Sequence, residues 1–424
     1  MGLAISFRGK IRNLRHIETF EDRIVELALE INGFARVWRS APKNNVERVV
    51  RGVMLDLAPG LETVSLLLSP EGALVPLGLV SDAESGPVAE DQWVSVQTQF
   101  GALEAHVMLL ELLDAMSKTF FPSLEMKDEG QYLKTRDLES LHLRMLSTEA
   151  TLASLAKRLE RSPVTPTKPD FKTIQKQITD ASARVLRILK RPPEHPPVIF
   201  KDDGSDDYQR HGTEAEWDAF YKENERKQHG LTRAFEEQSL KHDNPRASFE
   251  EALRSEGIVD LPQVDDKEGE SRPDFEWEID DDKLDDEAEL KDDPDVRSQR
   301  EDRHPLLKRV SKLTMKILKL PRHDQQVPGG FLDPLVRGIL EMSGGMAQVY
   351  SGQDNDTPFG LKLVQLKRVL RGASFARASI FPVLHSGILS KTDCRHILDE
   401  VTAIEEVIQK ELHKTRRKLQ KKNN

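Results

Sequence analysis

WVSVQTQFGALEAHVMLLELLDAMSKTFFPSLEMKDEGQY, residues 93–132, is the stretch that decides the fold. Its first part, 93–100, alternates apolar and polar residues as a strand does, and Gly101 follows as a turn. Apolar residues then recur at helical spacing over 102–119, and a second short strand is expected over 123–127. The stretch therefore predicts a strand-helix-strand unit.

The residues before this stretch predict the rest of an α+β domain over 1–134. The expected elements are a strand at 3–11, a helix at 17–31 and further strands at 34–39, 46–57, 61–68 and 73–79, the last of them forming a meander. Neither a GxGxxG after a strand nor a GxxxxGK[ST] occurs, so nucleotide binding of the Rossmann or P-loop type is not predicted. We expect an antiparallel or mixed sheet with helices on one face, and the strand-helix-strand unit completes the sheet begun at Leu3.

Beyond residue 134 the apolar periodicity is helical. Residues 135–190 predict a helical hairpin, and residues 303–424 predict an all-α bundle with helices at 304–320, 332–350, 358–384 and 392–420. Short connections that contain Gly or Pro favour antiparallel neighbours, hence a four-helix bundle. The pairs Gly344-Gly345 and Gly372-Ala373 lie inside predicted helices, where each glycine costs about 1 kcal/mol relative to alanine. We interpret them as points where two helices cross.

Residues 191–302 predict an acidic, mostly disordered linker between the two folded parts. The run 265–295 holds 17 Asp/Glu and 4 Lys/Arg, a net charge of −13, whereas the whole chain is at −10. Two apolar islands interrupt the linker within residues 213–261, one of them on a predicted helix at 213–229. Such islands dock either on a partner protein or back on their own chain, and the sequence favours neither alternative.

The predicted bundle is basic, with 22 Lys/Arg and 11 Asp/Glu from Arg303 to Asn424. Its candidate contacts for an anion or a nucleic acid are Lys367, Arg368, Arg371, Arg416, Arg417 and Lys418. No aromatic residues interleave with the cations of the C-terminal tail, so any nucleic-acid binding is expected to be non-specific. Two alternatives stay open: the cations meet a protein partner or the chain's own acidic run, or they serve only solubility.

Glu104, His106 and Asp128 are the candidate catalytic residues. A carboxylate and an imidazole at the start of a helix, with a carboxylate after the next strand, can in principle perform acid–base chemistry. The alternative is structural: Glu104 interacts with the helix dipole, His106 packs inside, and Asp128 belongs to a turn. There is no HExxH or GxSxG motif, and the single cysteine, Cys394, does not face His396 on a helix. No cofactor or metal is predicted.

The sequence gives a simple expectation for location. No apolar run approaches the roughly 18 residues of a membrane span, so no membrane partner is expected. The N-terminus carries charges where a signal peptide needs an apolar segment. One cysteine excludes an intramolecular disulfide and fits a reducing cytoplasm.

Several short sequence segments resemble a bacterial protein family with no assigned function. They are FRGKI (7–11), LDLAPGLETVSLLLSPEG (55–72), VQTQFGALEAHVMLLELLDA (96–115), MKDEGQYLKTRDL (126–138) and LKRVLRGASFARASIFP (366–382). The resemblance implies a bacterial cytoplasmic setting and transfers no catalytic residue, cofactor or partner.

These observations lead to three hypotheses about function. The first is a non-enzymatic, cytoplasmic interaction or scaffold protein, in which the islands within 213–261 can bind a protein partner. The second is a non-specific nucleic-acid-binding protein that acts through residues 303–424. The third is an enzyme with its site near Glu104, His106 and Asp128.

Overall fold

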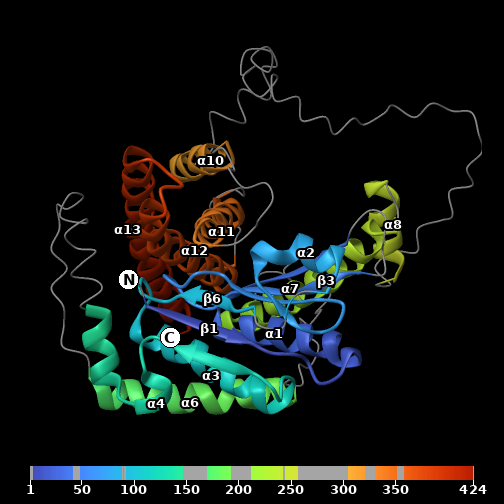
Figure 1. The fold of residues 1–424 in the computed structure, drawn as a ribbon. Helices are drawn as coiled ribbons and strands as arrows, with labels where there is room; N and C mark the ends of the chain where they lie inside the picture. The colour runs from blue at the N-terminus through green and yellow to red at the C-terminus, as the bar shows by residue number, and fades with distance from the viewer. Residues whose placement is uncertain are drawn as a thin grey trace, which may run out of the picture.

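The computed structural model describes residues 3–41, 48–87, 89, 92–146, 170–191, 212–241, 244–255, 304–319, 330–350 and 358–423. The N-terminal region holds two antiparallel sheets with helices, and the C-terminal region is a helical bundle (Figure 1). This confirms the predicted fold class, an α+β part followed by an all-α part. The acidic run 265–295 lies outside the described residues.

A three-stranded sheet forms around the first strand of the chain. Strand β1 (Ala4–Arg8) lies between β6 (Val94–Gln97) and β7 (Glu125–Asp128), and both pairings are antiparallel. Helix α3 (Leu103–Thr119) links β6 to β7. Ile5 and Phe7 of β1 are fully buried, and burial of such side chains contributes about 1.5–3 kcal/mol each. Residues 93–132 therefore complete the sheet begun at the N-terminus, as predicted.

The predicted meander forms a second sheet rather than extending the first. Strands β2 (Phe34–Ser40), β3 (Val50–Asp56), β4 (Val64–Leu68) and β5 (Leu74–Val75) pair in chain order, all antiparallel. The sheets meet where Lys10, just after β1, pairs with Ala73 beside β5. The turn between β4 and β5 ends at Gly72, whose φ of +85° suits glycine and strains residues that have a Cβ.

Three helices cover these sheets and share one apolar core with them. Helix α1 (Ile17–Ile31) packs on β2 and β3, and α6 (Phe171–Lys190) packs along α3 and α1. Asp170 begins α6 by accepting hydrogen bonds from the backbone N–H groups of the first turn. Of the partner helix in the predicted hairpin, residues 138–146 are helical, and residues 147–169 lie outside the described residues.

The bundle consists of α10 (Pro305–Leu318), α11 (Leu332–Tyr350), α12 (Phe359–His385) and α13 (Lys391–Asn423), close to the predicted bounds. Helices α11 and α12 approach most closely at Gly338 and Gly372, where a Cβ on either residue would lie within 2.5 Å of the other's carbonyl oxygen. A Cβ on Gly345 would also lie close to α12, 2.7 Å from Cγ2 of Val369. Gly344 is not at a crossing, because a Cβ there would meet nothing within 4 Å.

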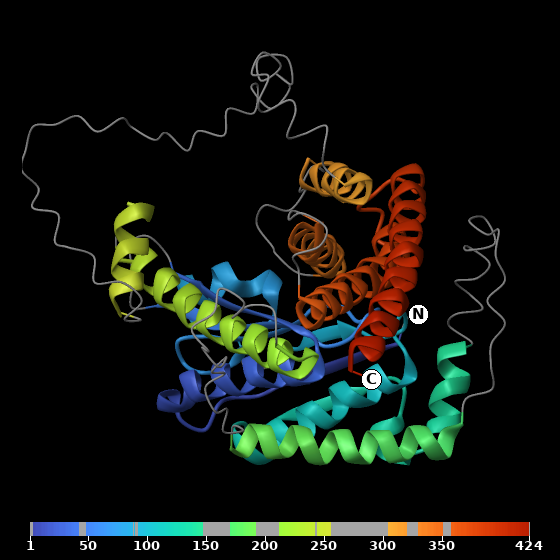
Figure 2. The same ribbon diagram turned by 180° about the vertical axis from the view of Figure 1, so that it is seen from behind.

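Part of the predicted linker is helix packed on the rest of the chain. Helix α7 (Glu214–Ser239) begins with a capping box at Thr213 and contacts β2, α1 and α12. Figure 2 shows it in yellow-green, running from α8 (Pro245–Ser255) toward the bundle. Trp217 of the first apolar island is 7 % exposed. Of the two alternatives for this island, docking on its own chain is the one observed.

The N-terminal region and the bundle also contact each other directly. Phe34 of β2 stacks edge-on against Phe375 of α12, with ring centroids 4.9 Å apart. Buried Asp56 at the end of β3 forms a 3.0 Å ion pair with Arg337 of α11. Burial raises the pKa of Asp56, and Arg337 opposes that rise. The helices of the described residues include none that is both long and apolar enough to cross a membrane.

Candidate functional site

His106 and Asp128 lie in direct contact. His106 is on the first turns of α3, and its Nε2 is 3.1 Å from Oδ1 of Asp128. Its other nitrogen, Nδ1, is 2.7 Å from the hydroxyl oxygen of Thr98, which follows β6. Thr98 was not predicted as part of this group, although its position at the end of the strand before α3 places it next to the helix start. The three side chains form a chain of contacts from β6 through α3 to β7.

This chain of contacts is closed to solvent. The side chains of His106 and Asp128 are 0 % and 2 % exposed. Asp128 also accepts hydrogen bonds from the backbone N–H groups of Gly130 and Leu133. Burial raises the pKa of Asp128, but the hydrogen bond from His106 and those backbone groups outweigh it and hold the pKa below its ordinary value. The hydrogen bonds from Gly130 and Leu133 to Asp128 hold the turn after β7.

Glu104 does not join this group. It lies in the first turn of α3 and is partly exposed, and among the described residues no hydrogen bond or ion pair connects it to His106 or Asp128. The geometry therefore brings together two of the three candidate catalytic residues, in a buried arrangement that fits the structural alternative. Cys394 is likewise buried, and burial raises the pKa of its thiol to about 11, far from a reactive thiolate.

The candidate anion contacts on α12 meet acidic residues of the same chain. Arg368 pairs with Glu225 of α7 and, at 3.1 Å, with Glu341 of α11. Arg371 lies 2.6 Å from Glu341 and 3.7 Å from Glu225. Lys367 pairs with Glu214, at the start of α7. All three predicted cations of α12 therefore contact the first half of α7 or the neighbouring helix.

The other three candidate contacts lie elsewhere. Arg416, Arg417 and Lys418 are exposed near the end of α13. Within the described part of the chain, no ion pair is formed by any of the three. The six predicted contacts thus form two separate groups, one covered by α7 and one facing solvent.

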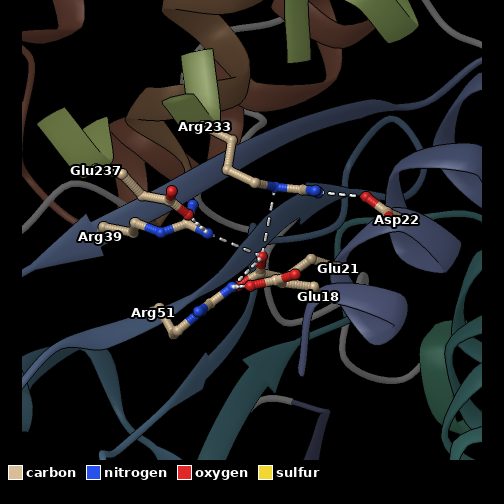
Figure 3. A network of polar contacts seen from close by, with 7 residues as sticks. All are labelled: Glu18, Glu21, Asp22, Arg39, Arg51, Arg233 and Glu237. Atoms are coloured by element: carbon tan, nitrogen blue, oxygen red, sulfur yellow. Dashed lines mark hydrogen bonds and ion pairs between the residues drawn. The ribbon is translucent and has the colours of Figure 1, made fainter. Parts of the chain in front are cut away.

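The second half of α7 lies over a buried carboxylate, Glu21 of α1 (Figure 3). The Glu21 side chain is 0 % exposed and accepts hydrogen bonds of 3.0 and 3.1 Å from Arg51 of β3. Arg39 of β2 donates a third, at 3.3 Å, and Arg233 of α7 lies 3.6 Å away. One carboxylate thus meets three guanidinium groups, from two strands and α7.

Further ion pairs extend this network along α7. Arg39 also contacts Glu237 at 2.9 Å, Arg233 pairs with Asp22, and Arg226 lies 2.8 Å from Glu26. Burial lowers the pKa of Arg39, and the carboxylate of Glu21 acts against that shift. Removing one partner of a buried ion pair costs about 3–5 kcal/mol, because the other charge is left unpaired. The network therefore fixes the position of α7 on the N-terminal region.

Glu21 was missed at the sequence level, although a signal was present. It follows Phe20 and precedes Ile24, both on the apolar stripe that predicted α1. A carboxylate on the edge of a buried stripe needs a cationic partner. The partners lie on β2, β3 and α7, and nothing in the sequence marks Arg39, Arg51 or Arg233 as those partners.

A pocket of about 400 Å³ opens where α7, α11 and α12 meet. Its walls include Arg337, Arg368, Glu225 and Glu341, and Gly344 of α11 forms part of the lining. Tyr221 of α7 also lines the pocket, and its hydroxyl donates a 2.7 Å hydrogen bond to Gln348.

Two titratable groups of α7 have strongly shifted pKa values. Burial raises the pKa of Glu236 to about 7, and the nearby carboxylates of Glu21 and Glu237 add to the rise against Arg39 and Arg36. Burial lowers the pKa of His229 to about 4, with a contribution from Arg337 and Arg233. Both shifts arise from the contact of α7 with the rest of the chain.

In comparisons with protein-family models, curated proteins and solved structures, no match to the chain was found. In the described part of the chain, no group of three or more His, Cys, Asp or Glu residues is arranged to hold a metal ion.

Proposed function

We propose that this protein is a non-enzymatic interaction protein whose C-terminal bundle binds acidic helical segments of other proteins. The observation that carries the proposal is the pairing of Lys367, Arg368 and Arg371 on α12 with Glu214 and Glu225 of α7. The bundle already holds an acidic helix from its own chain, and a partner of the same chemistry can take that place.

The charge pattern of α7 supports this proposal. Its residues 214–225 carry five Asp/Glu and one Lys/Arg, and this half contacts the basic α12. Residues 226–239 carry two Asp/Glu and three Lys/Arg, and this half pairs with Glu21, Asp22 and Glu26 of α1. Each half therefore meets residues of opposite charge.

Few buried apolar contacts hold α7 in place. Of its 26 residues, only Trp217 and Ala234 are buried. Exposed and half-buried ion pairs contribute about 0–1 kcal/mol each and weaken as salt is added. The acidic half of α7, residues 214–225, is held by exposed or half-buried pairs to α12 and can exchange with a competitor. The second half stays anchored by the buried network around Glu21.

The test uses the full chain and a labelled peptide of residues 212–241. In a Glu214→Lys/Glu225→Lys variant the acidic half of α7 is repelled, so the peptide should bind α12 with an affinity that falls steeply with salt. The wild-type protein should bind it much more weakly, because its tethered α7 competes at high effective concentration. A peptide carrying the same two Lys substitutions is the control. Failure of the wild-type peptide to bind the variant at low salt would overturn the proposal.

A second candidate function is non-specific nucleic-acid binding at the end of α13. The observation that favours it is the exposure of Arg416, Arg417 and Lys418, which are not covered by α7. Cations in such a position can contact phosphates and release counterions. The full-length protein should then bind single-stranded RNA at low salt. Changing all three cations to Gln should make the slope of log binding constant against log salt concentration shallower by about one unit per residue. No binding at low salt would exclude this candidate.

The enzyme hypothesis around Glu104, His106 and Asp128 is less well supported, because a substrate has no open face at the buried His106–Asp128 pair. We further propose a cytoplasmic location, which rests on the single, buried Cys394.

A further inference from the structure

The pocket between α7, α11 and α12 contains a glycine that packing does not explain. Gly344 lies inside α11, where a glycine costs about 1 kcal/mol relative to alanine. Gly338 and Gly345 of the same helix are needed, since a Cβ on them would lie 2.5 Å from the Gly372 oxygen and 2.7 Å from Val369. A Cβ on Gly344 would meet nothing within 4 Å. Gly344 lines the pocket, so its missing side chain leaves the pocket space open.

The charged walls of the pocket are balanced. Arg337 and Arg368 provide two cations, and Glu225 and Glu341 provide two carboxylates. Partners beyond the lining keep this balance, since Arg337 pairs with Asp56 and Arg371 contacts both Glu225 and Glu341. An anion entering alone would compete with those carboxylates for the arginines and leave them unpaired, and a cation would do the converse. A molecule that carries both charges can pair with an arginine and a carboxylate together, which leaves no half-buried charge without a partner.

The remaining lining can bind neutral polar groups. Four carboxamides reach the pocket, those of Asn224, Gln228, Gln348 and Gln365. A carboxamide carries both a donor and an acceptor, and of these four the Gln348 oxygen already accepts from Tyr221. The rings of Phe34 and Tyr221 and the side chain of Leu340 add a limited apolar surface. A volume of about 400 Å³ is at the small end of ligand pockets, which suits a molecule no larger than a dipeptide.

We propose that this pocket binds a small zwitterion, an α-amino acid or a dipeptide. The ligand contacts residues of α7, α11 and α12 at once, and it therefore holds α7 against the bundle. The proposal does not depend on whether α7 also gives way to a partner protein, since occupancy of the pocket is measured directly.

The experiment is a thermal-shift screen of the full chain with pools of free amino acids and, separately, of dipeptides. At about 10 mM, some ten times the dissociation constant of a weak 1 mM site, a bound pool should raise Tm by about 1–2 °C. The separate pools distinguish the two sources of the ligand. The hit should bind at least about tenfold more tightly than its N-acetyl and its amide derivatives, each of which has lost one charge.

Gly344→Leu adds an apolar side chain to the pocket at a position where the Cβ itself meets no atom within 4 Å. It should abolish the shift while keeping or raising the ligand-free Tm. Gly78→Leu is the matched control, because a Cβ at Gly78 also meets nothing within 4 Å and this residue lies outside the pocket lining. Gly344→Ala should weaken binding only in part. The proposal is overturned if no pool shifts the wild-type Tm, if Gly344→Leu binds as the wild type does, or if the singly charged derivatives bind equally well.

Discussion

Arg368 of α12 forms an ion pair with Glu225 of α7, which connects the basic bundle to a helix from the acidic part of the chain. Arg371 lies beside this pair, and Glu341 of α11 contacts both arginines. The carboxylates of two helices thus surround two guanidinium groups of a third. We propose that this contact is a binding surface of the bundle, occupied by α7.

Reversing the charges of the Arg368–Glu225 pair one at a time should loosen α7. Arg368→Glu or Glu225→Arg places like charges together, and each should weaken docking by about 1–2 kcal/mol. The double variant restores opposite charges and should recover part of the loss, with a coupling of about 1 kcal/mol. The measurement is the rate of proteolytic cleavage within α7, which follows the population of the open form. Equal cleavage rates in the double and single variants would contradict the pairing.

Glu21→Ala should be among the most destabilising substitutions in α1. It leaves Arg39, Arg51 and Arg233 without their shared carboxylate, at a cost of about 3–5 kcal/mol. Glu18→Ala is the control, because Glu18 is 65 % exposed and lies 3.5 Å from Arg51, so its loss should cost about 0.5 kcal/mol. Urea unfolding midpoints compare the two. Similar losses of stability in both variants would show that the buried network contributes no more to stability than an exposed ion pair.

The pH dependence of the α7 contact should be nearly flat in the wild type because two shifts oppose each other. The pKa of Glu236 is raised to about 7. Its contribution to the stability of the contact is therefore fully present below pH 4.5, the ordinary pKa of this carboxyl, and is lost as pH rises through 7. The pKa of His229 is lowered to about 4. Its contribution to the stability of the contact is therefore fully present above pH 6.5, the ordinary pKa of this imidazole, and is lost as pH falls through 4. Between these limits the two changes run in opposite directions.

Single variants should separate these two effects. Glu236→Gln leaves His229 to titrate, and stability should then fall by about 1–3 kcal/mol between pH 7 and pH 4. His229→Gln leaves Glu236, and stability should instead rise over the same interval. Urea unfolding of both variants and the wild type across this range is the measurement. The same pH profile of stability in all three proteins would show that the contact of α7 shifts the pKa of neither group.

Two adjacent glycines of α11 should respond oppositely to the same substitution. Gly344→Ala adds a Cβ into open space and should stabilise the helix by about 1 kcal/mol. Gly345→Ala places its Cβ 2.7 Å from Cγ2 of Val369 and 3.2 Å from the Gln365 oxygen, and this overpacking should cost about 1–3 kcal/mol. Thermal unfolding reports both values. A stabilised Gly345→Ala protein would mean that α11 and α12 do not cross closely there.

The sequence predicted most helices well because local apolar periodicity determines them. The strand expected at 73–79 is only Leu74–Val75, followed by a 3-10 helix at Leu77–Leu79. The helices at 17–31 and 332–350 have the predicted bounds, and α12 differs by one residue at each end. The division of the strands between two sheets was not predicted. Each strand is recognised from its own local pattern, and pairing partners far apart in the chain leave no local signal.

The candidate site was predicted only in part, for a similar reason. His106 and Asp128 were candidates because each lies near an end of an element in the strand-helix-strand unit. The sequence did not predict that they meet, and they lie 3.1 Å apart. The aromatic residues near Trp217 predicted a helix at 213–229, and the observed helix continues to Ser239. That this helix lies on α12 follows from charge pairs between distant segments, such as Lys367 with Glu214, which no periodicity encodes.

The most direct test of the α7 contact is hydrogen exchange of α7 backbone amides in the wild type and in an Arg368→Glu/Arg371→Glu variant. We expect exchange in residues 214–225 to rise in the variant, and to rise in the wild type when salt is added, while exchange in α11 and α12 changes little. Unchanged protection of residues 214–225 in the variant, at low and at high salt, would contradict the claim that α7 is held at a binding surface of the bundle.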